Sequence, residues 1–119
     1  MPKKLTKRFN CPTEFTLAVL GGKWKTVILC YLKQRPLRYA ELRTLIPTLS
    51  DKVLSERLQE LVAVGLVARR SADGNGKGQV YGLTRKGMSL GELLAGLYGW
   101  GRQHAAAFGV HVGLPLTKI

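Results

Sequence analysis

The stretch LRTLIPTLSDKVLSERLQELVAVGLVARRSADGNGKGQVYGL, residues 42–83, decides the fold of this chain. It reads in order as a short helix, a turn, a longer helix and two strands around a glycine-rich loop. Pro47 ends the first helix, because the residue before a proline is pushed out of helical geometry. Ser50 begins the second helix, since its hydroxyl can accept a hydrogen bond from a free N–H of the first turn. This order predicts a winged helix-turn-helix, a fold that is mainly α with a small β-hairpin.

The wing is predicted from the residues that follow Gly65, which supplies the left-handed residue at the end of the second helix. Two short segments, residues 66–70 and 79–83, are predicted to be strands. The loop SADGNGKG between them contains the pairs DG and NG, which favour tight hairpin turns because glycine readily adopts positive φ.

The second helix of the stretch has an apolar face and a polar face, as a helix needs if it is to stay attached to a domain while reading DNA. The apolar stripe consists of Leu54, Leu58, Leu61 and Val62. The polar face consists of Lys52, Ser55, Glu56 and Gln59. We therefore predict that this helix enters the major groove, the alternative being an ordinary solvated helix face.

Each polar side chain of this face suits a particular DNA group. Lys52 can donate to guanine O6 or N7, Gln59 can pair with adenine, and Glu56 can accept from cytosine. Ser55 can contact a base or a phosphate. Ser50 has two interpretations, because its hydroxyl can cap the helix or meet a phosphate at the helix N-terminus, and capping is the preferred one.

Three basic residues are predicted to contact phosphates, which fix position and salt dependence rather than sequence preference. They are Arg38, Arg43 and, in the wing, Lys77. Arg69 and Arg70 are also basic, but the strand that carries them can turn them away from DNA.

Charge and length agree with a small DNA-binding domain. The chain has 119 residues, enough for a single domain, and its 19 Lys and Arg against 7 Asp and Glu give a net charge of +12. Charge alone leaves two alternatives open: the basic residues aid solubility, or they lie on an acidic membrane surface. No apolar run is long enough to cross a bilayer and no secretory signal is recognisable, so we expect a cytoplasmic protein.

Further helices are predicted before the deciding stretch. Residues 1–10 form a basic arm, and a short helix begins at Pro12 and ends at the glycine pair 21–22. The next helix begins near Lys23, with one apolar face formed by Trp24, Val27, Ile28, Tyr31 and Leu32. Leu29 falls on the other side of that helix, which suggests a second contact surface. In the two-turn helix over residues 39–46, we expect Leu42, Leu45 and Ile46 to point inward.

The C-terminal region is predicted to form a dimerisation helix over residues 84–108, followed by a tail over 109–119. Its apolar face is too wide for the rim of a small monomer. The alternative is that this helix caps only its own domain. The predicted interface, with one residue from the first helix, consists of Phe15, Leu90, Leu93, Leu94, Leu97, Tyr98 and Trp100.

Three segments together resemble the HxlR-type family of bacterial transcriptional regulators: CPTEFTLAVLGGKWKTVIL (11–29), SDKVLSERLQELVAVGLV (50–67) and YGLT (81–84). The resemblance runs from about residue 11 to 101 and includes LYGWG at 97–101. It implies a homodimeric DNA-binding regulator whose terminal helices build the dimer and whose Ser50 helix enters the major groove. The chain departs from the family pattern in its glycine-rich loop and at Gln79, where an apolar residue is usual.

The resemblance also bears on Cys11, since family members commonly answer electrophiles, oxidants or small metabolites, some through the matching cysteine. Cys11 lies at a helix N-terminus near Lys7 and Arg8, a setting that favours the thiolate. The alternative is a small apolar residue, and Cys30 is interpreted as structural. Both should be reduced thiols in the cytosol, and two cysteines without matching histidines predict neither a zinc site nor a cofactor.

Other classes of function find less support in the sequence. No Ser-His-Asp, Cys-His or paired-carboxylate arrangement is recognisable, so we predict that the chain is not an enzyme. A non-specific architectural DNA- or RNA-binding protein would use the same basic surface and is the alternative to a sequence-specific regulator.

Overall fold

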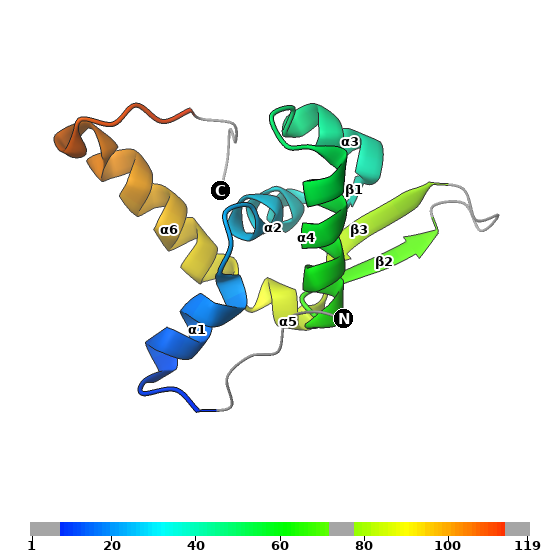
Figure 1. Ribbon diagram of the computed structural model, residues 1–119, viewed down its shortest axis with the longest axis horizontal. Helices are drawn as coiled ribbons and strands as arrows, with labels where there is room; N and C mark the ends of the chain where they lie inside the picture. Colours follow the sequence, from blue (N-terminus) through cyan, green and yellow to red (C-terminus); the bar gives the residue numbers. More distant parts are fainter. Residues whose placement is uncertain (1–7, 72–77, 114–119) are drawn as a thin grey trace.

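The computed structural model describes residues 8–71 and 78–113 and is mainly helical, with one small sheet (Figure 1). The elements in chain order are α1 (Pro12–Leu20), α2 (Lys25–Gln34), β1 (Leu37–Arg38), α3 (Tyr39–Leu45), α4 (Asp51–Ala63), β2 (Val67–Ser71), β3 (Gln79–Leu83), α5 (Arg85–Met88), α6 (Gly91–His104) and the 3-10 helix η1 (Ala105–Phe108). This order confirms the predicted winged helix-turn-helix, with α3 and α4 as its two helices and β2–β3 as the hairpin.

The boundaries of α1 and α4 follow from local sequence. Pro12 occupies the first turn of α1, and α4 begins after Ser50, whose Oγ accepts a hydrogen bond of 3.2 Å from the Val53 N–H. Gly65 ends the α4 region with φ +83°, a conformation that favours glycine. These three local predictions are confirmed. Helix α2 begins at Lys25, two residues later than predicted, because the two turn residues Lys23 and Trp24 follow the positive-φ Gly22.

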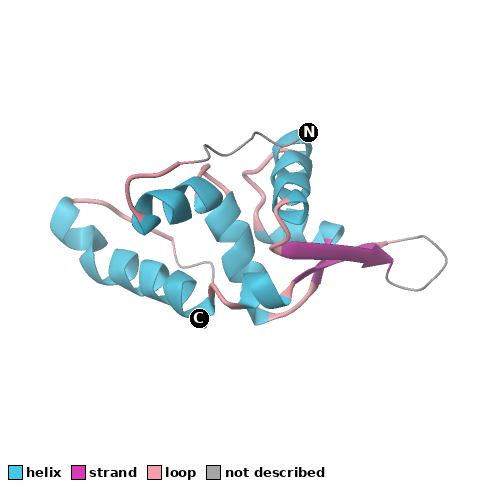
Figure 2. Ribbon diagram, turned by 90° about the horizontal axis from the view of Figure 1, so that it is seen from below, coloured by secondary structure: helices cyan, strands magenta, loops and turns pink. Residues whose placement is uncertain are grey.

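The sheet has the order β1-β3-β2 with antiparallel pairing throughout. Val67 pairs with Leu83 and Ser71 with Gln79, so β2 and β3 form the predicted hairpin, which extends away from the helices (Figure 2). The two-residue strand β1, with Leu37 paired to Tyr81, was not predicted. It exists because the second edge of β3 is open to pairing, a tertiary condition that no local pattern encodes.

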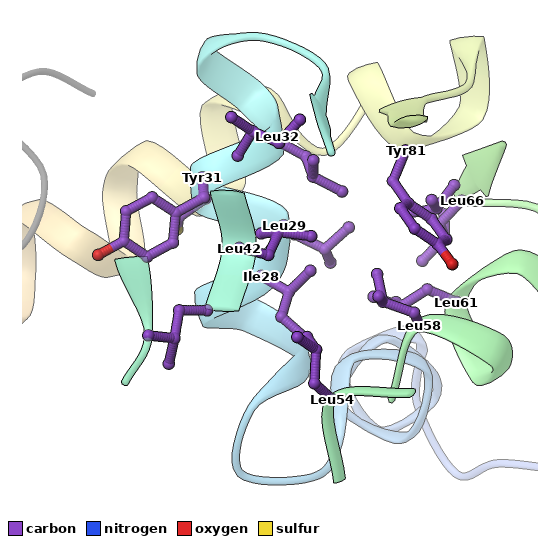
Figure 3. Packing of buried hydrophobic residues seen from close by; sticks show 14 of the residues in the cluster. Ile28, Leu29, Tyr31, Leu32, Leu42, Leu54, Leu58, Leu61, Leu66 and Tyr81 are labelled. Atoms are coloured by element: carbon purple, nitrogen blue, oxygen red, sulfur yellow. The ribbon is translucent and has the colours of Figure 1, made fainter. Parts of the chain in front are cut away.

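The core is built around α2, in which Ile28, Leu29, Cys30, Tyr31 and Leu32 are all buried. Figure 3 shows Ile28 and Leu29 among the leucines of α3 and α4. Leu29, on the side of α2 opposite the main apolar stripe, has an exposed fraction of 0%, so the second contact surface that it suggested is covered within this chain. Helix α2 contacts β3, α4 and α6, and these elements together surround it.

Helix α3 differs from its prediction at one position. Leu42 and Ile46 are buried as expected, but Leu45 is 39% exposed. Leu45 instead lines an open pocket on the outer face of α3, beside Thr44 and Glu41. A helix of two turns has a narrow buried face. Leu42 and Ile46, the residue after the helix, already occupy that face.

The C-terminal region is not one helix over residues 84–108, as predicted, but α5, α6 and η1. Thr84 caps α5 by accepting a hydrogen bond of 3.0 Å from the Gly87 N–H, and the chain turns before α6. Gly87 is required there because a Cβ would collide with the backbone carbonyl oxygen of Leu66. After this turn, α6 contacts α2 and extends away from the domain body (Figure 1).

In the described part of the chain no helix alone has the length and apolar composition to cross a membrane. The two helices Pro12–Leu20 and Lys25–Gln34 have that length and composition only when they are taken together, and the chain bends by 82° between them.

Candidate nucleic-acid interface

Helix α4 presents the predicted polar face to solvent, opposite its buried stripe. Four positions spaced i, i+3, i+4 and i+7 share one side of a helix. Lys52 and Gln59 are exposed, and Ser55 and Glu56 are partly exposed. Leu54, Leu58 and Leu61 on the opposite side are buried. Of the predicted apolar stripe, Val62 is partly buried at its border. The structure thus brings the four predicted base-contacting residues together on one accessible surface.

The N-terminal end of α4 is fixed to α3 by a cluster of polar contacts that we call the turn clamp: Tyr39, Arg43, Asp51 and Ser55. Tyr39 Oη donates a 2.9 Å hydrogen bond to Asp51 Oδ1 and lies 3.4 Å from Ser55 Oγ. Arg43 Nε lies 2.8 Å from the same Asp51 oxygen. Arg43 also donates to the backbone carbonyl of Leu49 in the turn. The clamp sets the direction in which α4 leaves the turn.

Sequence reasoning missed Tyr39 and Asp51, because a side-chain contact across 12 residues leaves no periodic pattern. The clamp also changes the interpretation of Arg43, which was predicted to contact phosphate. Its guanidinium is already paired within the chain, so a phosphate would have to share or replace Asp51. Ser55 likewise has an intramolecular neighbour in Tyr39.

The other predicted phosphate contacts are placed differently. Arg38 is exposed where β1 meets α3, and its backbone N–H donates a 2.9 Å hydrogen bond to Glu41 Oε1. That hydrogen bond, with smaller contributions from Arg35, lowers the pKa of the Glu41 carboxyl. The Arg38 side chain is therefore at the surface while its backbone begins α3. Lys77 lies outside the described residues.

A chain of charged contacts runs along the side of α4 that faces α2. Arg57 lies 2.7 Å from Glu60 and 3.4 Å from Glu56, and Glu60 lies 3.7 Å from Lys25 of α2. Glu56 is therefore partly neutralised by Arg57, which weakens its role as an acceptor for cytosine. The i, i+3 spacing of Arg57 and Glu60 is a recognisable signal for such a pair.

Arg69 and Arg70 are exposed on the edge strand β2. Because successive strand residues point to opposite faces, the two guanidinium groups diverge. At most one of them therefore shares a face with a given DNA surface, and their orientation toward DNA stays a prediction.

Cys11 is exposed at the N-terminus of α1, in extended geometry. A hydrogen bond from the Glu14 backbone, followed by the side chain and backbone of Thr13, lowers the pKa of the Cys11 thiol. The helix N-terminus accordingly favours the thiolate there, as predicted. Lys7 lies outside the described residues. In contrast, burial raises the pKa of the Cys30 thiol, and Cys30 packs in the core of α2.

The predicted dimer residues divide into two groups. Leu94 is fully buried in its own chain, and Leu90 and Tyr98 pack against the same core. Leu94 is therefore a core residue rather than an exposed interface residue, because the turn after α5 presses this side of α6 onto α2. The remaining members, Phe15, Leu93, Leu97 and Trp100, are exposed. We call these four residues the apolar face.

The apolar face continues beyond the predicted residues. The Trp100 ring lies 4.5 Å from His104 and 6.1 Å from Phe108, both centroid to centroid, and Phe108 is exposed. Leu17 adds a second exposed apolar residue on α1. A domain of this size rarely leaves so many large apolar side chains in water without a partner.

Comparison with known proteins agrees with this architecture. The model of the HxlR-like helix-turn-helix family matches residues 19–108. The chain is 40% identical over 98 residues to the uncharacterized HTH-type transcriptional regulator YtcD of Bacillus subtilis (strain 168), with 82% of this chain and 78% of YtcD covered. It is 39% identical over 99 residues to YkvN of the same organism, with 83% and 84% covered.

Solved structures give the same result. The redox regulator HypR in its reduced form superposes with a TM-score of 0.78 at 30% identity, covering 83% of this chain and 98% of that chain. The reduced transcriptional regulator YodB from B. subtilis gives 0.68 at 32% identity, covering 80% and 94%. These relatives are transcriptional regulators, not enzymes. The chain belongs to the HxlR-like helix-turn-helix family and is a transcriptional regulator of the helix-turn-helix type.

Proposed function

We propose that this regulator binds a specific palindromic DNA operator as a homodimer, with α4 in the major groove. The observation that carries the proposal is the accessible polar face of α4, formed by Lys52, Ser55, Glu56 and Gln59, directly opposite leucines that anchor the helix in the core. The net charge of +12 supports attraction to a polyanion. Arg38 and Lys77 supply phosphate contacts, and Arg43 joins them only where a phosphate shares or replaces Asp51.

Base readout is assigned first to Lys52 and Gln59, because both are exposed. Ser55 and Glu56 take smaller parts, since Tyr39 and Arg57 already contact them. Ser50 remains a cap, with its hydroxyl directed to the Val53 N–H. The turn clamp holds α4 in one orientation, which lowers the cost of ordering the helix on DNA.

The homodimer is supported by the apolar face, because α6 uses one side for its own core and leaves Leu93, Leu97 and Trp100 exposed. A two-fold pair predicts two half-sites whose centres are about one helical turn, or a multiple of it, apart.

Selection of bound fragments from the source genome, followed by footprinting, tests the operator. A palindromic footprint supports the proposal, and one unpaired half-site per bound protein contradicts the dimer. Retained binding to random duplex without any preferred site would favour the alternative, a non-specific DNA- or RNA-binding protein.

Two variants separate base readout from phosphate contact. Gln59→Ala should change the ranking of operator variants, whereas Lys77→Ala should weaken all sequences similarly and reduce the salt slope by about one unit. Equal losses on every sequence for Gln59→Ala would remove that residue from base readout.

We further propose that Cys11 responds to oxidants or electrophiles. The exposed thiol has a lowered pKa, and it lies beside α1, which contributes Phe15 to the apolar face. Structures of the similar regulator YodB include quinone-bound and diamide-treated forms. Operator binding of wild type and Cys11→Ser before and after diamide tests the response. Oxidant-driven release that persists in Cys11→Ser would contradict it.

A further inference from the structure

A pocket of about 260 Å³ lies where α1, the end of α4 and α5 meet. Its walls are apolar: Phe15 and Val19 come from α1, and Val64 and Leu66 come from the turn after α4. Leu20 is the only buried residue of α1, so the helix is anchored at one end and leaves this space open. Figure 1 shows α1 below the domain body, next to α5.

Lys86 is the one charged side chain among the described residues that line the pocket. No described carboxylate lies within ion-pair distance of its ammonium group. The ammonium lies close to Gly65 at the end of α4, since a Cβ on that glycine would be 3.6 Å from Lys86 Nζ. The ammonium thus lies at the negative, C-terminal end of the α4 dipole, which stabilises its charge. The partial charges of a helix end do not neutralise a full positive charge, so the ammonium can still bind an anion.

We propose that this pocket binds a small monocarboxylate with an apolar body. The apolar walls favour a ring or short branched chain by excluding water from it, and Lys86, which pairs with no described carboxylate, favours a single carboxylate. The volume is below the roughly 300–1,000 Å³ of pockets for drug-sized ligands, so the occupant is small. Ser89, also in the lining, adds a hydroxyl at the polar end.

The pocket is placed to affect DNA binding, and this part of the inference rests on the proposed function. Val64 ends α4, and Phe15 belongs to α1, so one occupant contacts both the recognition helix and the helix that follows Cys11. The Phe15 ring also meets Phe9 edge to face at 5.5 Å between centroids. A ligand that prefers one arrangement of α1 and α4 shifts the operator affinity, and DNA shifts the ligand affinity by the same factor.

The binding test uses the full chain and three probes of similar shape: benzoate, benzyl alcohol and benzylammonium. Protein NMR titrations should show saturable shifts at Val64, Leu66 and Phe15 with benzoate, and about three- to fivefold weaker binding of benzyl alcohol. Lys86→Gln should bind benzoate and benzyl alcohol equally. Lys86→Glu should reverse the preference toward benzylammonium. Lys23→Gln, an exposed lysine outside the pocket, is the matched control and should bind benzoate like wild type.

A filling variant, Thr16→Trp, tests the site without changing charge, since Thr16 lies on the pocket wall. It should lose benzoate binding while retaining its helical circular dichroism. If that variant does not fold, the Lys86 series decides alone. Unchanged benzoate affinity in Lys86→Gln, or shifts spread over Lys52 and other basic residues instead of the pocket, would overturn the inference. A wild-type pocket that shows no saturable shift, as when a second copy covers it, would also overturn it.

Coupling to DNA is measured by operator titration with and without saturating benzoate. Benzoate should change the operator affinity of wild type and leave that of Thr16→Trp unchanged, whereas Lys86→Gln should need about three- to fivefold more benzoate for the same change. An unchanged wild-type affinity would overturn the coupling. Failure of the protein to select any operator would contradict the proposed function, whereas the NMR titration still decides the pocket.

Discussion

Helices α2 and α6 have similarly apolar sequences but very different surroundings. In α2 the five consecutive residues 28–32 are buried, so the middle of this helix is covered on every side. In α6 only Leu94 is fully buried, while Leu97 is 50% and Trp100 59% exposed. The two helices contact each other, with α2 in the centre and α6 at the surface (Figure 1).

The difference teaches that apolar content alone does not identify a core helix. Helix α2 is covered by β3, α4 and α6, so every apolar side chain finds a neighbour in the same chain. Helix α6 has α2 on one side, while Leu93, Leu97 and Trp100 stay exposed, with Phe108 of η1 near the Trp100 ring. The same composition thus stabilises the fold in one helix and provides a surface for association in the other.

The largest expected effect comes from truncating α2. Leu29→Ala should lower the free energy of unfolding by about 2–5 kcal/mol, because it leaves a cavity among fully buried leucines. Urea denaturation at one fixed protein concentration measures it. Leu97→Ala is the matched control on α6. At concentrations where the protein is monomeric, its loss should stay within about 0.5 kcal/mol. Equal losses at the two positions would remove the distinction between the helices.

The second prediction concerns association through α6. Trp100→Ala should weaken the homodimer by about 2 kcal/mol or more, roughly 30-fold in Kd, as expected for an aromatic residue central to an interface. Sedimentation equilibrium measures the change. Met88→Ala is the control, because Met88 is equally exposed but lies on α5, outside the apolar face. A Kd unchanged by Trp100→Ala would mean that α6 is exposed for another reason.

Two glycines sharpen the comparison further. Gly87 is buried and has no room for a Cβ beside the Leu66 carbonyl, whereas Gly96 has no atom within 4 Å of that position. Gly87→Ala should destabilise the monomer by about 1–3 kcal/mol. Gly96→Ala should stabilise it by up to about 1 kcal/mol through helix propensity. Denaturation in a Trp100→Ala background measures both. If Gly96→Ala destabilised that monomer, the space around Gly96 would not be open.

The parts of the fold that could be predicted are those that local chemistry determines. Ser50 begins α4 because its hydroxyl accepts a nearby N–H, and Gly65 ends it because the backbone there has positive φ. The hairpin follows from its glycine-rich loop. Each of these features involves residues only a few positions apart.

The errors share a different cause, since each depends on which distant element covers a residue. Helical spacing placed Leu29 opposite the main apolar stripe, but three neighbours surround α2 and bury it. Leu45 was expected inside and is exposed, because none of the elements in residues 8–71 and 78–113 covers that side of α3. The single helix over 84–108 failed because Gly87 packs against the Leu66 carbonyl and turns the chain.

The candidate site divides in the same way. Spacing alone grouped Lys52, Ser55, Glu56 and Gln59, because a helix face is a local property. The turn clamp was missed, since Tyr39 and Asp51 meet only after α3 and α4 have packed. The clamp also shows why a list of basic residues overstates phosphate contacts: Arg43 already has a carboxylate partner.

The smallest expected effect concerns pH and contrasts Cys30 of α2 with Cys11 of α1. Hydrogen bonds at the start of α1 lower the pKa of Cys11, so its thiolate forms at lower pH than that of an ordinary thiol, which has a pKa of about 8.5. Alkylation by iodoacetamide should therefore begin at lower pH for Cys11 than for a cysteine-containing peptide. Mass spectrometry assigns the modified residue.

Cys30 should show the opposite behaviour, because burial in α2 raises its pKa and limits access. The neutral thiol is the form that the folded state favours. Its stabilising effect is complete below the pKa of an unfolded thiol and is lost as the pH rises through the higher folded value. In Cys11→Ser, which retains Cys30, the free energy of unfolding should therefore fall as the pH rises through that window. In the double variant Cys11→Ser/Cys30→Ala, which lacks both thiols, the fall should be smaller. Alkylation of Cys30 as fast as Cys11 in the folded protein would show that α2 is not enclosed, and the contrast between α2 and the surface helices would fail.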